Sequence, residues 1–302
     1  MIGLKSSQAW ITGQPGAVRG AFWMVLASAL FTGMPIAVRT LSDHMGPAEI
    51  IFFRSVLGLA FMAPYFLWTR KRPLRTNVLK LHVQRSAINF VAMVLWFYAL
   101  ALIPLGQAVA LHFTMPLFIV LLAALFLGER VGVGRWATTA VGFVGVLIVL
   151  RPGVVEVGLP ALAVLCSAVF YGGAVTTIKV LTRTESAAVI TFYSHLILLV
   201  IAAIPTVFWW GAPRVEDTPY LLLLAVCGTL APFAVTRALR VVDASVVAPL
   251  DFLRLPFTAI AGYFLFAEIP DNWTILGAAV IIGATSYLAR REASATHRAE
   301  GS

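Results

Sequence analysis

The sequence predicts an all-α polytopic membrane protein in which ten transmembrane helices form two inverted five-helix repeats. Three observations lead to this fold class. Apolar runs of membrane-spanning length recur along nearly the whole chain, of which 60% is hydrophobic and only 12% charged. The basic residues gather at alternate ends of these runs. The second half of the chain also matches the first at a spacing of 139 positions.

The apolar runs are separated by short connections, which leave no room for a soluble domain. The first run has no small-residue cleavage site and is long enough to span, so we expect a retained helix rather than a signal peptide. The expected spans are 17–40, 46–68, 84–103, 105–127, 133–150, 158–181, 186–209, 217–238, 244–266 and 270–289. The expected organisation is a cytoplasmic lead at 1–16, a first repeat at 17–153, a second repeat at 154–290 and a cytoplasmic polar tail at 291–302.

The net charge of +9 is distributed according to membrane topology. With the N-terminus inside, the outer side holds only Arg39, Arg151 and Arg214. The cytoplasmic side then holds Lys5, Arg19, Arg70, Lys71, Arg72, Arg75, Lys80, Arg85, Arg130, Arg135, Lys179, Arg183, Arg237, Arg240, Arg290, Arg291 and Arg298. This bias predicts that both termini are cytoplasmic, in a bacterial inner membrane. It also accounts for the basic charge without a nucleic-acid partner.

The internal match holds in one register over more than half of each repeat. Adding 139 to a residue number relates Ser28 to Ser167, Phe31 to Phe170, Gly33 to Gly172, Phe53 to Phe192, Ser55 to Ser194 and Glu129 to Glu268. Five spans per half is an odd number, so the second half must enter the membrane in the opposite direction. The sequence therefore predicts an inverted repeat with a pseudo-two-fold axis in the membrane plane, as many secondary transporters have.

Three segments carry a resemblance to a known family: FFRSVLGL at 52–59, PLFIVLLAALFLGER at 116–130 and LPFTAIAGYFLFAE at 255–268. Two five-helix halves that each close with Pro, an apolar run and Glu resemble the EamA family of the drug/metabolite transporter superfamily. The resemblance covers about 17–290, and Pro256 is offset by one position from Pro116. It implies a carrier with a central cavity between spans 1, 3, 4, 6, 8 and 9, and it leaves the substrate open.

Ionisable residues at membrane depth are candidates for the site, because their burial in lipid is costly. Arg54, about eight residues into the second span, could pair with Glu49, cap carbonyls, or anchor an anionic group of the cargo. His112 and Asp251 are equivalent in the 139-residue register and are candidates for proton coupling or substrate contact. Alternatively, His112 is a neutral hydrogen-bonding residue and Asp251 pairs with Arg254, three positions along the same helix.

Further candidates are aromatic or amide side chains that could line the cavity and stack on a flat ring. They are Asn89, Trp96 and Tyr98 in the third span and Tyr171 in the sixth. His195, in the seventh span, is a further candidate or a satisfied core histidine. The register equates Tyr193 with Arg54, so we expect the two halves to differ at this depth.

Prolines within spans free backbone carbonyls and permit bends where a cavity or a neighbour satisfies them. Pro116 lies in the fourth span, and Pro249 and Pro256 lie in the ninth, close to His112 and Asp251. Bends beside polar groups in two repeat-related helices point to a central site.

No nucleotide-binding, hydrolase or metal-ligand motif is present, and Cys166 and Cys227 form no CxxC pair. We therefore expect a secondary transporter without a cofactor, monomeric or homodimeric. Riboflavin uptake is the first hypothesis for its function, S-adenosylmethionine uptake the second, and amino-acid or metabolite export the third. Two further alternatives are an intramembrane enzyme that uses His112, His195 and Asp251, and a channel, which the inverted repeat disfavours.

Overall fold

The computed structural model describes residues 16–69, 76–126, 133–152, 157–181, 184–208, 210–239 and 250–300. Their helices are α2 (Gly16–Leu41), α3 (Pro47–Thr69), α4 (Leu79–Leu102), α5 (Leu105–His112), α6 (Met115–Phe126), α7 (Val133–Leu150), α8 (Leu159–Leu181), α9 (Ala187–Phe208), the short 3-10 helix η1 (Val215–Asp217), α10 (Thr218–Leu239), α12 (Arg254–Phe266) and α13 (Asn272–Glu300). The two residues Glu129 and Pro249, which the sequence singles out, lie outside these ranges.

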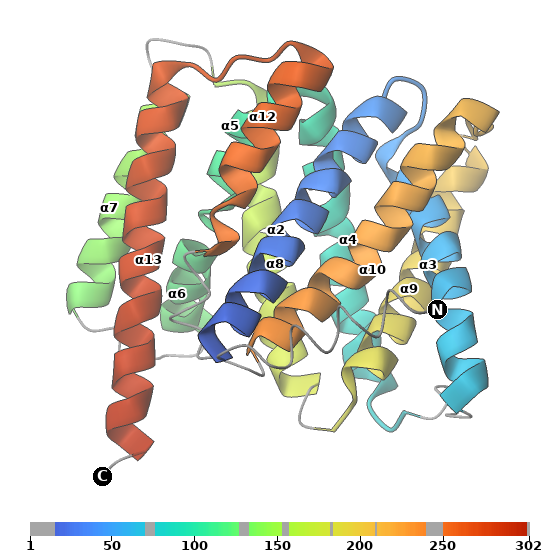
Figure 1. Cartoon of the computed structure of the whole chain (residues 1–302), viewed down its shortest axis with the longest axis horizontal. Helices are drawn as coiled ribbons and strands as arrows, with labels where there is room; N and C mark the ends of the chain where they lie inside the picture. The colour runs from blue at the N-terminus through green and yellow to red at the C-terminus, as the bar shows by residue number, and fades with distance from the viewer. Residues whose placement is uncertain are drawn as a thin grey trace.

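Within the described ranges, six helices are long and apolar enough to cross a membrane, by length and composition. They cover Val18–Leu41, Pro47–Pro64, Leu79–Leu102, Leu159–Ile178, Ala188–Phe208 and Val215–Val235. Three shorter apolar segments, Leu105–Leu121, Trp136–Leu150 and Arg254–Phe266, lie among them. The described part of the chain is therefore an all-helical bundle with the composition of a membrane protein (Figure 1).

Helices from the two halves of the chain pack against each other in pairs that the 139-residue register exchanges. Helix α2 packs on α10, and its counterpart pair, α8 and α4, packs in the same way. The contacts α10–α3 and α4–α9 are exchanged likewise, as are α12–α2 and α6–α8. Two further pairs, α3–α9 and α7–α13, each join a helix to its own counterpart in the register. They lie at opposite ends of the bundle (Figure 1).

The α7–α13 crossing depends on two glycines that face each other. A methyl group built on Gly277 would lie 2.7 Å from the carbonyl oxygen of Gly145, and one on Gly145 would lie 3.0 Å from that of Gly277. Small residues let helices in a membrane approach until their backbones touch. Gly145 and Gly277 therefore let α7 and α13 pack closely, whereas a methyl group on Gly283 would meet nothing within 4 Å.

The fourth and ninth spans are interrupted at equivalent positions. Helix α5 ends at His112 and α6 begins at Met115, so Phe113 and Thr114 form a turn, and Phe252 and Leu253 form a turn just before α12. Pro116 and Pro256 lie in the first turn of the following helix, where proline is tolerated, but neither has an N–H to bond the carbonyl four residues before it. The one-residue offset of the prolines therefore leaves the two interruptions in register.

Polar contacts near one end of the bundle join the two halves. Arg39 donates to the carbonyls of Leu100 (2.6 Å) and Ile103 (3.0 Å) and pairs with Glu268 at 3.0 Å. The other carboxylate oxygen of Glu268 accepts the backbone N–H of Leu105 at 2.7 Å. Glu268 thus caps the start of α5, as expected for a glutamate that braces helix ends.

Candidate functional site

The two helix interruptions meet in the interior of the bundle. The rings of Phe113 and Phe252, which the register equates, lie 5.0 Å apart between centroids with an interplanar angle of 60°. At each interruption the same local bond closes the turn: the N–H of Thr114 donates to the carbonyl of Leu111, and that of Leu253 to the carbonyl of Leu250. This aromatic contact marks the place where polar side chains of both halves converge.

Beside it, Asp251 and Arg254 form an ion pair. The distance from Arg254 Nη2 to Asp251 Oδ2 is 2.7 Å, so the predicted pairing at a three-residue spacing is confirmed. The guanidinium carbon also lies 4.7 Å from the ring centre of Phe31 and 5.2 Å from that of Phe113. Asp251 Oδ1 is buried without a hydrogen-bond partner among the described residues, so this carboxylate keeps one acceptor free.

His112 forms an aromatic cluster with two other predicted residues. Its ring lies 4.5 Å from that of Trp96 on α4 and 5.2 Å from that of Tyr171 on α8, the latter edge to face. Its Nε2 is buried and has no partner within the described ranges. The structure therefore brings His112, Trp96 and Tyr171 together as an aromatic box with one unpaired ring nitrogen.

Arg54 reaches into the same interior from α3. Its Nη1 lies 3.7 Å from the sulfur of Met93, which also accepts from Asn89 Nδ2 at 3.4 Å. Gly228 on α10 leaves space for the guanidinium, since a methyl group there would lie 2.6 Å from Arg54 Nε.

Arg54 does not form an ion pair with Glu49, which was one of the alternatives. Glu49 instead accepts the backbone N–H of Gly211 at 3.1 Å, close to the ion pair between His44 and Asp217 at 2.8 Å. Arg54 forms no ion pair with a described residue, and its Nε has no partner there.

His195 lies against the backbone of α3. A methyl group at Gly58 would lie 2.6 Å from its ring, so the glycine makes room for the imidazole. The residue is 3% exposed, and its Nδ1 has no partner within the described residues. His195 is therefore a buried imidazole beside α3, and its role in the site stays a prediction.

Tyr98 lies apart from the aromatic cluster of His112, and its role as a lining residue stays a prediction. It is 39% exposed and lies on one face of α4 with Val91 and Leu102, which are 40% and 54% exposed. Two positions along a helix correspond to about 200° of rotation, so Tyr98 and Trp96 point to nearly opposite sides. The sequence does not reveal which of the two faces the bundle.

Sequence reasoning missed Arg85 and Met93, and it did not single out Phe31 or Phe113. Arg85, Asn89, Met93 and Trp96 follow each other at helical spacings of four, four and three, so they share one face of α4. This spacing was visible in the sequence. Arg85 was assigned to the cytoplasmic boundary from topology alone, and methionine has no distinctive chemical signature.

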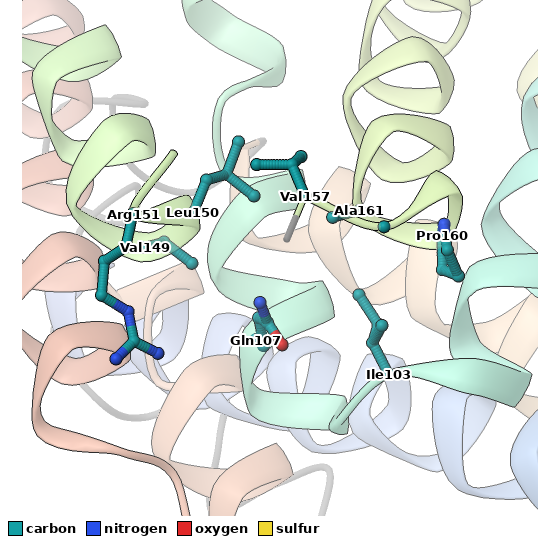
Figure 2. A pocket seen from close by; sticks show the side chains of 9 residues that line it. Ile103, Gln107, Val149, Leu150, Arg151, Val157, Pro160 and Ala161 are labelled. Carbon is teal, nitrogen blue, oxygen red and sulfur yellow. The ribbon is translucent and has the colours of Figure 1, made fainter. Parts of the chain in front are cut away.

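A cavity of about 320 Å³ lies beyond the aromatic cluster, toward the end of the bundle that holds Arg39 and Glu268. Figure 2 shows its lining from the α4–α5 junction, the end of α7 and the start of α8. Its residues are Ile103, Gln107, Val149, Leu150, Arg151, Val157, Gly158, Pro160 and Ala161. It contains none of the predicted site residues, although Gln107 precedes His112 by about 7.5 Å of helix rise on α5.

The chain has long apolar helices, helix pairs that are exchanged between its two halves, and polar groups in the bundle interior. These features are typical of a multi-pass membrane protein of the transporter class. The chain belongs to the EamA-like transporter family, which matches residues 18–151 and 158–290. It is thus a transporter of the drug/metabolite superfamily, as its sequence resemblance implied.

Several characterised relatives are similar over nearly their whole length. A riboflavin transporter of Rhizobium johnstonii is 33% identical over 91% of this chain and 92% of its own. An S-adenosylmethionine uptake transporter of Rickettsia bellii is 30% identical over 91% and 95%, and the pseudopaline exporter CntI of Pseudomonas aeruginosa is 31% identical over 90% and 96%. One crystal structure at 17% identity superposes with a TM-score of 0.62 over 91% of this chain and 98% of that chain, which supports the fold.

Proposed function

We propose that this protein is a secondary carrier that crosses the bacterial inner membrane ten times, with both termini in the cytoplasm. Its two five-helix halves are inverted relative to each other and rock around a central site. The observation that carries the proposal is the pair of equivalent interruptions that meet at Phe113 and Phe252. Discontinuous helices at a repeat interface are the usual position of a transporter's substrate site.

The helices around this contact support the expected cavity between spans 1, 3, 4, 6, 8 and 9. Helix α2 packs on α10 and α12, α8 packs on α4, α5 and α6, and α12 packs on α5. His112 ends α5, Arg254 begins α12, and Asp251 lies just before α12. We infer that His112 and Asp251, each with one unpaired polar atom, contact the cargo or exchange protons during transport.

For the cargo, we propose a small metabolite with a planar ring, with riboflavin as the first candidate. The box formed by Trp96, His112 and Tyr171 suits a stacked ring, and riboflavin transporters are among the relatives at 33% identity. S-adenosylmethionine, the second candidate, carries a net positive charge. Arg54 and Arg85, which have no acidic partner among the described residues, oppose it. Export of an amino acid or metabolite is the third candidate.

Uptake by purified protein in proteoliposomes tests the carrier proposal. We expect saturable uptake of riboflavin, acceleration by unlabelled riboflavin on the opposite side, and recovery of chemically unchanged cargo. A chemically altered product would support the intramembrane-enzyme alternative, and flux that never saturates would support a channel.

His112→Ala and Asp251→Asn are expected to lower the initial uptake rate about tenfold each, which corresponds to about 1.4 kcal/mol. The reason is that His112→Ala removes an unpaired ring nitrogen, and Asp251→Asn removes a carboxylate charge that could bind cargo or exchange a proton. The matched controls are His44→Ala and Asp43→Asn, at the outer end of the bundle, which should keep wild-type uptake. Wild-type rates in well-folded His112→Ala and Asp251→Asn proteins would contradict the assignment.

A further inference from the structure

Two arginines in the bundle interior have no negatively charged partner in the described parts of the chain. Among the described residues, Arg54 Nε and both Nε and Nη1 of Arg85 are buried without a hydrogen-bond partner. The two side chains carry the same charge and repel each other. The contact of Arg54 with the Met93 sulfur is a weak one that cannot neutralise a charge. Asp251, which the register relates to His112, is already paired with Arg254.

The fold itself does not require these charges. In the 139-residue register, Arg54 corresponds to Tyr193 and Arg85 to Leu224, so the second half builds the same helices without them. The polar face of α4, with Arg85, Asn89, Met93 and Trp96, likewise corresponds to Leu224, Gly228, Pro232 and Val235 on α10. The charged lining belongs to one half alone, which points to a ligand rather than to the architecture.

Burying cations in a membrane interior without counter-charges is costly, and such residues mark ion or substrate pathways. Guanidinium groups bind carboxylates and phosphates through two parallel N–H···O bonds, and this geometry suits planar or tetrahedral oxyanions. Asn89 adds an amide, and His195 adds an imidazole beside the same two arginines. Trp96 lies on the same face of α4, about 16 Å of helix rise from Arg85.

We propose that Arg54 and Arg85 bind an anionic group, a carboxylate or a phosphate, of a cargo whose planar ring lies against Trp96, His112 and Tyr171. This inference rests on the proposed carrier function and names the class of its substrate. It selects anionic ring compounds over neutral ones and excludes cargo with a net positive charge.

Inorganic phosphate alone and acetate alone are the first probes, added to the purified full chain at constant ionic strength. At least one of them should raise the Tm of the wild type and of the control Arg237→Gln, an exposed arginine at the end of α10. Neither should raise the Tm of Arg54→Gln or Arg85→Gln. The two salts distinguish a phosphate site from a carboxylate site. No shift in the wild type, or equal shifts in the interior variants, would overturn the inference.

The ligand-free variants give a second readout that does not depend on any cargo. If the arginines are unpaired, Arg54→Gln and Arg85→Gln should melt at or above the wild-type Tm, because a costly buried charge is removed. A clearly lower Tm would show that the arginines stabilise the empty protein through partners of their own, and the inference would fail.

Uptake of riboflavin and of riboflavin 5′-phosphate separates this inference from the proposed function. We expect about a tenfold preference for the phosphate ester, a difference of about 1.4 kcal/mol, that disappears in Arg85→Gln and persists in Arg237→Gln. Equal uptake of the two flavins would overturn the anion-site proposal but would still support the carrier proposal. Anion-dependent Tm shifts without flux of either flavin would contradict a flavin as the cargo but would still support the anion site.

Discussion

At the scale of single residues, several polar atoms in the bundle interior have no hydrogen-bond partner among the described residues. His112 Nε2, Asp251 Oδ1 and Arg54 Nε are buried without partners in the described ranges, although the residues come from three different segments of the chain. Buried polar atoms are normally satisfied, so a cluster of exceptions indicates a place where a ligand or water binds. Trp96 is 8% exposed and completes the ring contacts of His112.

Trp96→Ala should weaken cargo binding about tenfold or less, since an aromatic contact contributes about 0.5–1.5 kcal/mol. Tyr98→Ala, two positions away on the outward face of α4, is the matched control and should bind cargo as the wild type does. Binding by the detergent-purified proteins, measured from quenching of flavin fluorescence, checks both. Equal losses in the two variants would contradict the orientation of α4 described above.

At the scale of helices, two local features set the geometry of the site. Pro116 and Pro256 interrupt equivalent spans, and the glycine contact between α7 and α13 holds the outermost pair of helices together. Glu268 reaches the start of α5 because Ala267 adopts a left-handed conformation (φ 53°) at the end of α12, where its N–H bonds the carbonyl of Tyr263. This type of helix end turns the chain sharply and leads into Glu268.

Gly277→Ala should lower the Tm of the protein, because its methyl group would meet the carbonyl of Gly145 and force α7 and α13 apart. Overpacking of this kind costs about 1–3 kcal/mol. Gly283→Ala, on the same helix with open space around it, should leave the Tm unchanged or raise it, since alanine favours helix over glycine. Thermal unfolding followed by tryptophan fluorescence checks the pair, and equal Tm values would refute the close crossing.

At the scale of the whole molecule, helices pair in the exchanged manner that a two-fold repeat produces. Contacts between connecting segments also lie at one end of the bundle or the other. His44 pairs with Asp217 and Arg151 with Asp271 at one end, whereas Thr76 donates to Glu185 at the opposite end. Connections that follow each other along the chain lie at alternate ends of the bundle, and this agrees with the distribution of basic residues. We infer from both that the His44 end faces outward.

Single cysteines in a Cys166→Ala, Cys227→Ala background test this orientation. Asp43→Cys and Glu216→Cys should react with a membrane-impermeant maleimide in intact cells. Asn77→Cys and Ser186→Cys should react only after the membrane is permeabilised, because we place them on the cytoplasmic side. The reverse pattern would invert the proposed topology without altering the helix pairing.

The sequence by itself determined the membrane class, the family, the repeat register and most of the ionisable candidates, because each depends on patterns that run along the chain. Apolar runs, basic connections and a 139-residue spacing persist whatever the helices touch. Only the tertiary structure decided that Trp96 faces His112 while Tyr98 faces outward, and that Asp251 is occupied by Arg254. It alone also showed that Arg54 and Arg85 have no counter-charge in the described ranges. The physical reason is that charge balance and ring contacts depend on how helices distant in sequence are rotated against one another.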